Sequence, residues 1–183
     1  MKKNLIAAVV FTLPALMLAA CDTKVSTDDN ASAALAAAEA KLAGMAAYNA
    51  QIAAVNTLIE VWDSAEVDKL DAIALSNYER TAPDQNASSL DELKAFIRQV
   101  HDAYPDYHIT NDGVAAGPDG AFVQWTVTGI TAGDDATSGS GISATGMSRY
   151  RFKDGKIASE LVIFDTGAVL TQLDVDELPH TGE

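Results

Sequence analysis

Asp165 stands at the end of an apolar stretch, where a carboxylate could act as a general base. In an extended strand Ile157, Leu161 and Ile163 lie on the same side as Asp165, because side chains alternate between the two faces. A carboxylate in apolar surroundings holds a proton more tightly, which suits it to accept a proton from a carbon acid. Asp also commonly begins a helix, and Asp165 could instead cap one that starts near Thr166.

The other polar residues indicate neither a metal site nor a nucleophile. His101, His108 and His180 are expected on a helix, a strand and the tail, without the spacing of metal ligands. The chain has no G-x-S-x-G motif, which argues against a serine hydrolase. Arg80 and Arg149 could orient a polar group of a ligand, or form surface ion pairs of small energetic value. We therefore expect no bound metal.

The only cysteine, Cys21, ends a segment built like an export signal. Two lysines precede an apolar run over residues 5–17, and small residues follow it. The tetrad Leu-Ala-Ala-Cys at residues 18–21 resembles the lipobox of bacterial lipoproteins, in which the cysteine is acylated and becomes the first mature residue. The resemblance implies lipidation at Cys21 and a place in the bacterial cell envelope, facing the periplasm. Asp22 favours the inner membrane, and an ordinary secretory signal is the alternative.

The charge of the chain restricts its partners. The formal net charge is -14, and loss of the two N-terminal lysines with the signal would make the mature chain more negative. Nucleic acid is excluded as a partner on this ground, and anionic substrates are disfavoured. A neutral, apolar or cationic small molecule is the easier ligand, and contact with the membrane has to come from the lipid anchor.

The composition divides the chain into four parts. We expect a signal peptide over residues 1–20 and a lipidated cysteine with a flexible tether and an Ala-rich helical stalk over 21–45. One domain should cover 46–176, followed by a tail over 177–183. The spacer is expected over 22–32, and the Ala-rich, proline-free sequence predicts a long helix from about residue 31 to residue 63.

Periodicity predicts the elements that position Asp165. Residues 67–73 suit a short helix, and Ser89 with Glu92 forms a capping box for a helix over 90–103. Alternating apolar residues then predict strands, with turns of the Asp-Gly type at 118–120 and 153–155. The predicted strands cover residues 107–115, 121–131, 142–152 and 156–164. Helices followed by a meander indicate an α+β domain, with N-terminal helices packed on one face of a curved antiparallel sheet.

The predicted long helix also contains a weak heptad. Leu35, Leu42, Asn49 and Asn56 fall seven apart, with a second row of Ala38, Met45, Ile52 and Ile59. Asn at core positions can fix a dimeric register, so a homodimer is one alternative. A solvated spacer is the other, because large apolar residues are few.

Several segments together resemble the SnoaL-like domain of the nuclear transport factor 2-like superfamily. The matching segments are residues 61–70, 93–96, 104–106, 125–129, 146–157, 164–165 and 170–173. The resemblance implies a cone-shaped curved antiparallel sheet closed by helices over a pocket, also described as a cystatin-like α+β barrel. Two positions depart from the family, since Thr81 stands where many members have His and Leu161 where they have Trp.

Members of this family include polyketide cyclases, which close a ring by an aldol reaction with an aspartate as acid and base and without a cofactor. The matching position is Asp165, so the resemblance implies a lyase or isomerase of this type that needs no cofactor. The expected ligand-binding residues are Trp62, Tyr78, Arg80, Trp125, Arg149 and Leu161. A lipoprotein that binds an apolar ligand or a partner protein without catalysis is the alternative, because this fold serves both purposes.

Overall fold

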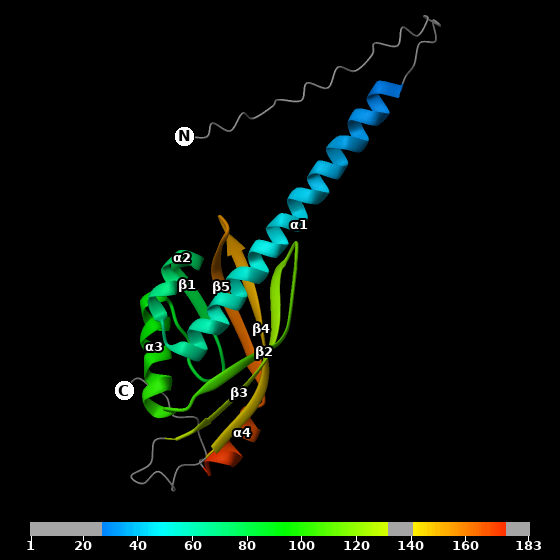
Figure 1. The fold of residues 1–183 in the computed structure, drawn as a ribbon. Helices are drawn as coiled ribbons and strands as arrows, with labels where there is room; N and C mark the ends of the chain where they lie inside the picture. The colour runs from blue at the N-terminus through cyan, green and yellow to red at the C-terminus, as the bar shows by residue number, and fades with distance from the viewer. Residues whose placement is uncertain (1–26, 132–140, 175–183) are drawn as a thin grey trace, which may run out of the picture. The chain divides into compact units, whose positions relative to one another are not determined.

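The computed structural model describes residues 27–131 and 141–174, which form helices α1 to α4, a 3-10 helix and five strands (Figure 1). Contacts within the chain separate two units, Met1–Ala38 and Glu39–Glu183. The predicted signal peptide 1–20, Cys21, Asp22 and the predicted tail 177–183 with His180 lie outside the described residues. In the described part, no helix combines the length and the apolar character needed to cross a membrane.

Helix α1 (Thr27–Ser64) begins inside the segment expected to be a spacer and ends where it was predicted. Its alanines favour the helical state over its N-terminal part. Ala65 ends the helix with a positive φ of 57°. The residues that α1 contributes to the core cluster at its C-terminal end: Ala54, Val55, Leu58, Ile59, Val61 and Trp62.

At this C-terminal end of α1, residues of the predicted heptad make contacts within the domain. Ile59 is buried in the core, and Oδ1 of Asn56 accepts a hydrogen bond of 2.7 Å from the amide of Asn111. Leu42 and Met45 are exposed. The C-terminal heptad positions therefore stabilise this fold, and the homodimer stays a prediction.

A 3-10 helix (Val67–Lys69) and helix α2 (Leu70–Ile73) cover the region predicted as one short helix. Helix α3 (Leu90–Ala103) has the predicted bounds. Ser89 caps the helix as predicted, because its Oγ accepts from the N–H of Glu92 at 3.2 Å. The Glu92 carboxylate accepts from the N–H of Ser88 at 2.7 Å, one residue before the N-cap, and not from that of Ser89 as a capping box would have it. The amphipathic sequence of α3 buries Leu90, Leu93, Lys94, Phe96 and Ile97.

Four strands form the predicted meander: β2 (His108–Gly117), β3 (Gly120–Ile130), β4 (Gly141–Lys153) and β5 (Lys156–Phe164). They pair in antiparallel register, and the two predicted turns join β2 to β3 and β4 to β5. Asp154 and Gly155 both have positive φ, which the twist of a tight hairpin requires. At Gly120, with φ of 118°, a side chain would also overlap the carbonyl oxygen of Tyr150.

The sheet differs from the prediction in one strand. Strand β1 (Ala74–Thr81) was not predicted, and it pairs in parallel with β5 at the edge opposite β2, in the order β1-β5-β4-β3-β2 (Figure 1). The sheet is therefore mixed and open. Within β1, the buried residues are Ala74, Tyr78 and Arg80. Because one of these inward residues is an arginine, the sequence of β1 does not show the alternation of apolar and polar residues that identifies a strand. The α+β class, with helices packed on a curved sheet, is confirmed.

A bulge in β5 decides which residues face the helices. Arg151 pairs with Ser159 but Phe152 pairs with Ile157, so Ala158 is extra. After it, Glu160 and Val162 are buried on the inner face with Tyr150 and Trp125, while Ile163 is exposed on the outer face. The predicted row of Ile157, Leu161 and Ile163 is thus wrong, because the bulge reverses the alternation between residues 157 and 161.

Helix α4 (Thr166–Leu173) returns to the inner face after β5. Gln172 holds it against β4, because its Oε1 accepts from the N–H of Ser143 at 2.6 Å and its Nε2 donates to the Ser143 carbonyl at 3.1 Å. Val169 and Leu173 thereby become part of the wall of a cavity.

Candidate functional site

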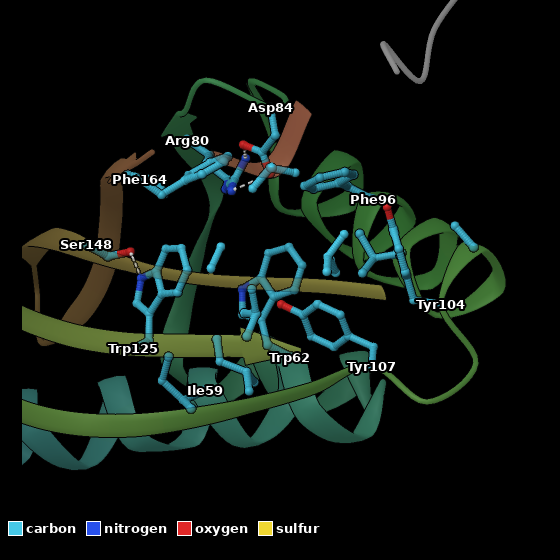
Figure 2. A pocket seen from close by; sticks show the side chains of 18 of the residues that line it. Ile59, Trp62, Arg80, Asp84, Phe96, Tyr104, Tyr107, Trp125, Ser148 and Phe164 are labelled. Atoms are coloured by element: carbon cyan, nitrogen blue, oxygen red, sulfur yellow. Dashed lines mark hydrogen bonds and ion pairs between the residues drawn. The ribbon is translucent and has the colours of Figure 1, made fainter. Parts of the chain in front are cut away.

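A cavity of about 260 Å³ lies between the inner face of the sheet and the helices (Figure 2). Helix α1 contributes Ile59 and Trp62, and helix α3 contributes Phe96 and Val100 to its lining. The strands contribute mainly apolar residues, among them Ile109, Trp125, Val127, Ile142, Ala144, Val162 and Phe164. The cavity therefore offers an apolar molecule a largely apolar, aromatic surrounding.

The aromatic side chains form two groups on the cavity wall. Trp62 meets Phe96 edge to face, with ring centres 5.6 Å apart, and lies 6.3 Å from the ring of Tyr107. Trp125 and Phe164 are tilted against each other at 6.2 Å. Trp62 and Trp125 are the two tryptophans of the chain, so its tryptophan fluorescence reports on this cavity.

Trp125 is fixed from two sides. Its indole N–H donates a hydrogen bond of 3.0 Å to Oγ of Ser148, which Figure 2 shows as a dashed line. Gly146 lies under the ring, where a Cβ atom would overlap Cη2 and Cζ2 of the indole. The glycine on β4 therefore gives the tryptophan of β3 the space in which it lies.

A buried carboxylate, that of Glu160, lies at the polar end of the cavity and is 5% exposed. Its Oε2 accepts the hydroxyl of Tyr78 at 2.7 Å, and its Oε1 accepts the hydroxyl of Tyr150 at 2.9 Å. Burial and the neighbouring negative charge of Glu160 raise the pKa of both phenols well above their ordinary value. Both tyrosines therefore stay protonated and act as donors to the carboxylate.

Arg80 supplies the positive charge at this end. Its guanidinium donates two bonds to the carboxylate of Asp84, at 2.9 and 3.1 Å, and one to the carbonyl of Gln85. Its Nε lies 3.6 Å from Oε2 of Glu160. Burial opposes the charge of Arg80, but the carboxylates of Glu160 and Asp84 outweigh it and raise the pKa of the guanidinium. Arg80 also lies over the ring of Phe96, 5.1 Å from its centre.

The charges of the polar end do not cancel. Two carboxylates, Glu160 and Asp84, face one guanidinium, that of Arg80, so this end of the cavity is negative on balance. An anion placed there would meet this negative charge in addition to that of the whole chain. Among the described residues, no three His, Cys, Asp or Glu side chains are grouped so as to hold a metal ion.

The structure brings three of the predicted ligand-binding residues to the cavity: Trp62, Arg80 and Trp125. Tyr78 is buried and does not line the cavity, but its hydroxyl donates to Glu160, which does. Arg149 and Leu161 pair with each other in register between β4 and β5. They lie on the outer face, because Ser148, Tyr150, Glu160 and Val162 occupy the inner one. Their predicted place in the pocket is therefore wrong.

Asp165 caps helix α4 and is exposed. Its Oδ1 accepts the N–H of Ala168 at 3.0 Å, and it is not among the cavity-lining residues. This geometry is the helix cap that the sequence left as one of two roles. Cys21, the predicted lipidation site, lies outside the described residues.

Sequence reasoning missed Glu160, Phe96, Tyr107 and Ser148 as residues of the cavity. A signal for Glu160 was present, since it shares a strand face with the apolar Val162 and Phe164. A charged residue in such a row is rare unless it is paired. The other three residues carry no comparable signal.

These features define an α+β domain with a cavity between a curved sheet and its helices. The sequence profile of the SnoaL-like domain matches residues 55–160, and the chain therefore belongs to the SnoaL-like domain family. No curated protein sequence shows significant similarity to the chain.

Solved structures share this fold at low sequence identity. A protein described as a SnoaL-like polyketide cyclase from Jannaschia sp. CCS1 is 17% identical, with a TM-score of 0.60, and the match covers 69% of this chain and 92% of that one. TsrD from Streptomyces laurentii is 22% identical, with a TM-score of 0.57 and coverage of 66% and 95%. A protein from Catenulispora acidiphila with a ketosteroid isomerase-like fold, in complex with trimethylamine, is 11% identical, with a TM-score of 0.57 and coverage of 67% and 92%.

Proposed function

We propose that this protein binds a neutral, apolar small molecule in its cavity and is tethered to a membrane through an acylated Cys21. The observation that supports binding most directly is the aromatic cavity, whose carboxylates are already engaged. Glu160 accepts from two tyrosine hydroxyls, and Asp84 is held by Arg80. An apolar body can be buried there without disturbing these pairs.

Acid and base catalysis of the lyase or isomerase type is the second candidate, supported by the family of the chain. Asp165 would have to leave its helix cap to meet a molecule in the cavity. Glu160 lines the cavity, and its two carboxylate oxygens already accept from the hydroxyls of Tyr78 and Tyr150. Binding of an apolar molecule requires no change at Asp165 or Glu160, and we therefore place it first.

Two fluorescent probes with one skeleton test the proposal. N-phenyl-1-naphthylamine is neutral, and 1-anilinonaphthalene-8-sulfonate adds a sulfonate to the same rings. The measurement uses the full chain with Cys21→Ser in buffer without detergent, because micelles would take up both probes. We expect the neutral probe to bind at one site per chain. The anion should bind at least about tenfold more weakly, because the polar end of the cavity is negative.

A pair of neighbouring substitutions on β4 serves as the control. Ala144 lines the cavity opposite Val127, so Ala144→Phe should fill it and weaken the neutral probe by about tenfold or more. Thr145 is exposed on the other face, so Thr145→Phe should leave binding unchanged. Equal binding of both probes, or binding that Ala144→Phe does not affect, would contradict the proposal.

A further inference from the structure

We infer that Tyr107 determines specificity in this cavity, by donating a hydrogen bond from its hydroxyl to a neutral oxygen acceptor on a molecule of up to three rings. This inference rests on the proposed binding function and adds the chemical class of the ligand. Ketones, quinones and esters carry such an acceptor, whereas a hydrocarbon or a carboxylate does not.

Tyr107 is held firmly in the wall of the cavity. Its N–H donates to the carbonyl of Tyr104 at 2.9 Å, and its ring lies against those of Trp62 and His101. Nε2 of His101 donates in turn to the carbonyl of Trp62 at 2.8 Å, which fixes the imidazole between α3 and α1. The backbone and the ring of Tyr107 are therefore both positioned before a ligand arrives.

The hydroxyl of Tyr107 donates no hydrogen bond to another residue of the described structure. It points into the cavity in Figure 2, and no partner for it occurs within residues 27–131 and 141–174. The hydroxyls of Tyr78 and Tyr150, by contrast, are both bound to Glu160. Burial raises the pKa of the Tyr107 phenol, so the group keeps its proton across the physiological range. A ligand oxygen that enters the cavity can accept this hydrogen bond, whereas a hydrocarbon cannot.

Charge decides between the acceptors. A carboxylate or sulfonate would also accept from Tyr107, but it would lie in the same cavity as Glu160 and Asp84, which face the single guanidinium of Arg80. A carbonyl oxygen takes the hydrogen bond without this repulsion. The structure thus favours a neutral acceptor over an anionic one.

Volume sets the size of the ligand. An apolar protein cavity of about 150 Å³ holds one benzene ring. The cavity described here has about 260 Å³, which suits a molecule with up to three rings and is too small to enclose four fused rings. A polycyclic molecule could enter only in part.

Three naphthalenes of similar shape test the inference by displacement of N-phenyl-1-naphthylamine. 2-Acetylnaphthalene carries a ketone, 2-ethylnaphthalene lacks the acceptor, and 2-naphthoate is an anion. Each is measured on the Cys21→Ser chain and on the same chain with Tyr107→Phe, which removes the hydroxyl and keeps the ring. Tyr48→Phe is the matched control, because Tyr48 lies on α1 and does not line the cavity.

We expect Tyr107→Phe to reduce the affinity for the ketone, relative to the ethyl compound, by about three- to tenfold. Binding of 2-ethylnaphthalene should stay unchanged, and Tyr48→Phe should affect neither compound. In the chain with Tyr107, 2-naphthoate should bind more weakly than the ketone. An unchanged ratio in Tyr107→Phe, with both compounds bound, would overturn the inference and leave the proposed function intact. Failure of all neutral compounds to bind would overturn both.

Discussion

The hydroxyl of Tyr78 donates to the carboxylate of Glu160 over 2.7 Å and joins two residues that are 82 positions apart in the chain. Tyr78 belongs to β1 and Glu160 to β5, so the bond crosses the parallel pair of strands at the edge of the sheet. Both side chains are buried. The bond gives the hydroxyl of Tyr78 an acceptor and Oε2 of Glu160 a donor, and a buried polar atom without such a partner would lower stability.

Replacing Glu160 should lower stability strongly. Glu160→Gln removes the negative charge of the acceptor from two tyrosine hydroxyls and leaves Asp84 as the anionic partner of Arg80 among the described residues. We expect a loss of about 3 kcal/mol in the free energy of unfolding, measured by urea denaturation. The control is Glu79→Gln, an exposed neighbour on β1, which should change stability by about 0.5 kcal/mol at most. Equal effects of the two substitutions would count against a stabilising network.

Stability should fall in alkaline solution because of the buried tyrosines. Burial raises the pKa of Tyr78 and Tyr150 in the folded chain, whereas in the unfolded chain each titrates near about 10. Above that pH the unfolded chain binds fewer protons than the folded one, so the free energy of unfolding decreases as pH rises. Below about pH 9 this contribution is fully present.

Denaturation curves at several pH values between 8 and 11 measure this effect. Tyr78→Phe removes one of the shifted groups and should make the decrease shallower, although the variant is less stable at pH 8. Tyr48→Phe should leave the slope unchanged, because Tyr48 takes no part in the hydrogen bonds to Glu160. A flat profile for the unsubstituted protein would show that the phenols do not titrate as expected.

Gly146 should be intolerant of a side chain. In Gly146→Ala the new Cβ would overlap the indole of Trp125 and lie 2.9 Å from the carbonyl oxygen of Ile163. Overpacking of this kind costs about 1–3 kcal/mol, and displacement of Trp125 into the cavity should also weaken binding of N-phenyl-1-naphthylamine. Gly113→Ala is the matched control on β2, where a Cβ would meet nothing within 4 Å. Thermal unfolding and tryptophan emission report the two effects separately.

Asp165 should behave as a helix cap. Asp165→Ala should cost about 1 kcal/mol of stability, because the N–H of Ala168 loses its acceptor, while Asp165→Asn retains an acceptor oxygen and most of the stability. Probe binding and its pH dependence should be the same in all three proteins. A change of pH dependence in Asp165→Asn would instead favour the role as a base.

The proposed anchor is tested by Cys21→Ser in cells. We expect the unsubstituted protein to partition with membranes and into detergent, and the variant to remain unprocessed or to move to the soluble fraction. Mass spectrometry of the mature N-terminus identifies the acyl chains directly. Recovery of the unsubstituted protein in the soluble fraction with a free thiol would exclude the anchor.

Local signals in the sequence predicted much of the fold. The helix cap at Ser89 and the two Asp-Gly hairpins depend on neighbouring residues, and all are formed. Strand β1 has no such signal, because its stability comes from pairing with β5, which is distant in sequence.

The candidate site was predictable only in part. Trp62, Arg80 and Trp125 line the cavity as expected. Alternation shows which residues share a strand face, but β5 is apolar on both faces and contains a bulge, so the pattern could not tell which face is inner. For this reason Leu161 was assigned to the pocket in place of Glu160.

The parallel pairing of β1 with β5 has a consequence for the order in which the chain folds. Strand β5 lies between β1 and β4, so the hairpins of β2 to β4 can form early from local contacts, while β1 has no partner until β5 has been added. Contacts of such long sequence separation slow folding, because the entropy of closing the loop is lost before the contacts form. Arg80 and Glu160 therefore meet only after nearly the whole domain has been synthesised, and the polar end of the cavity is among the last parts of the molecule to form.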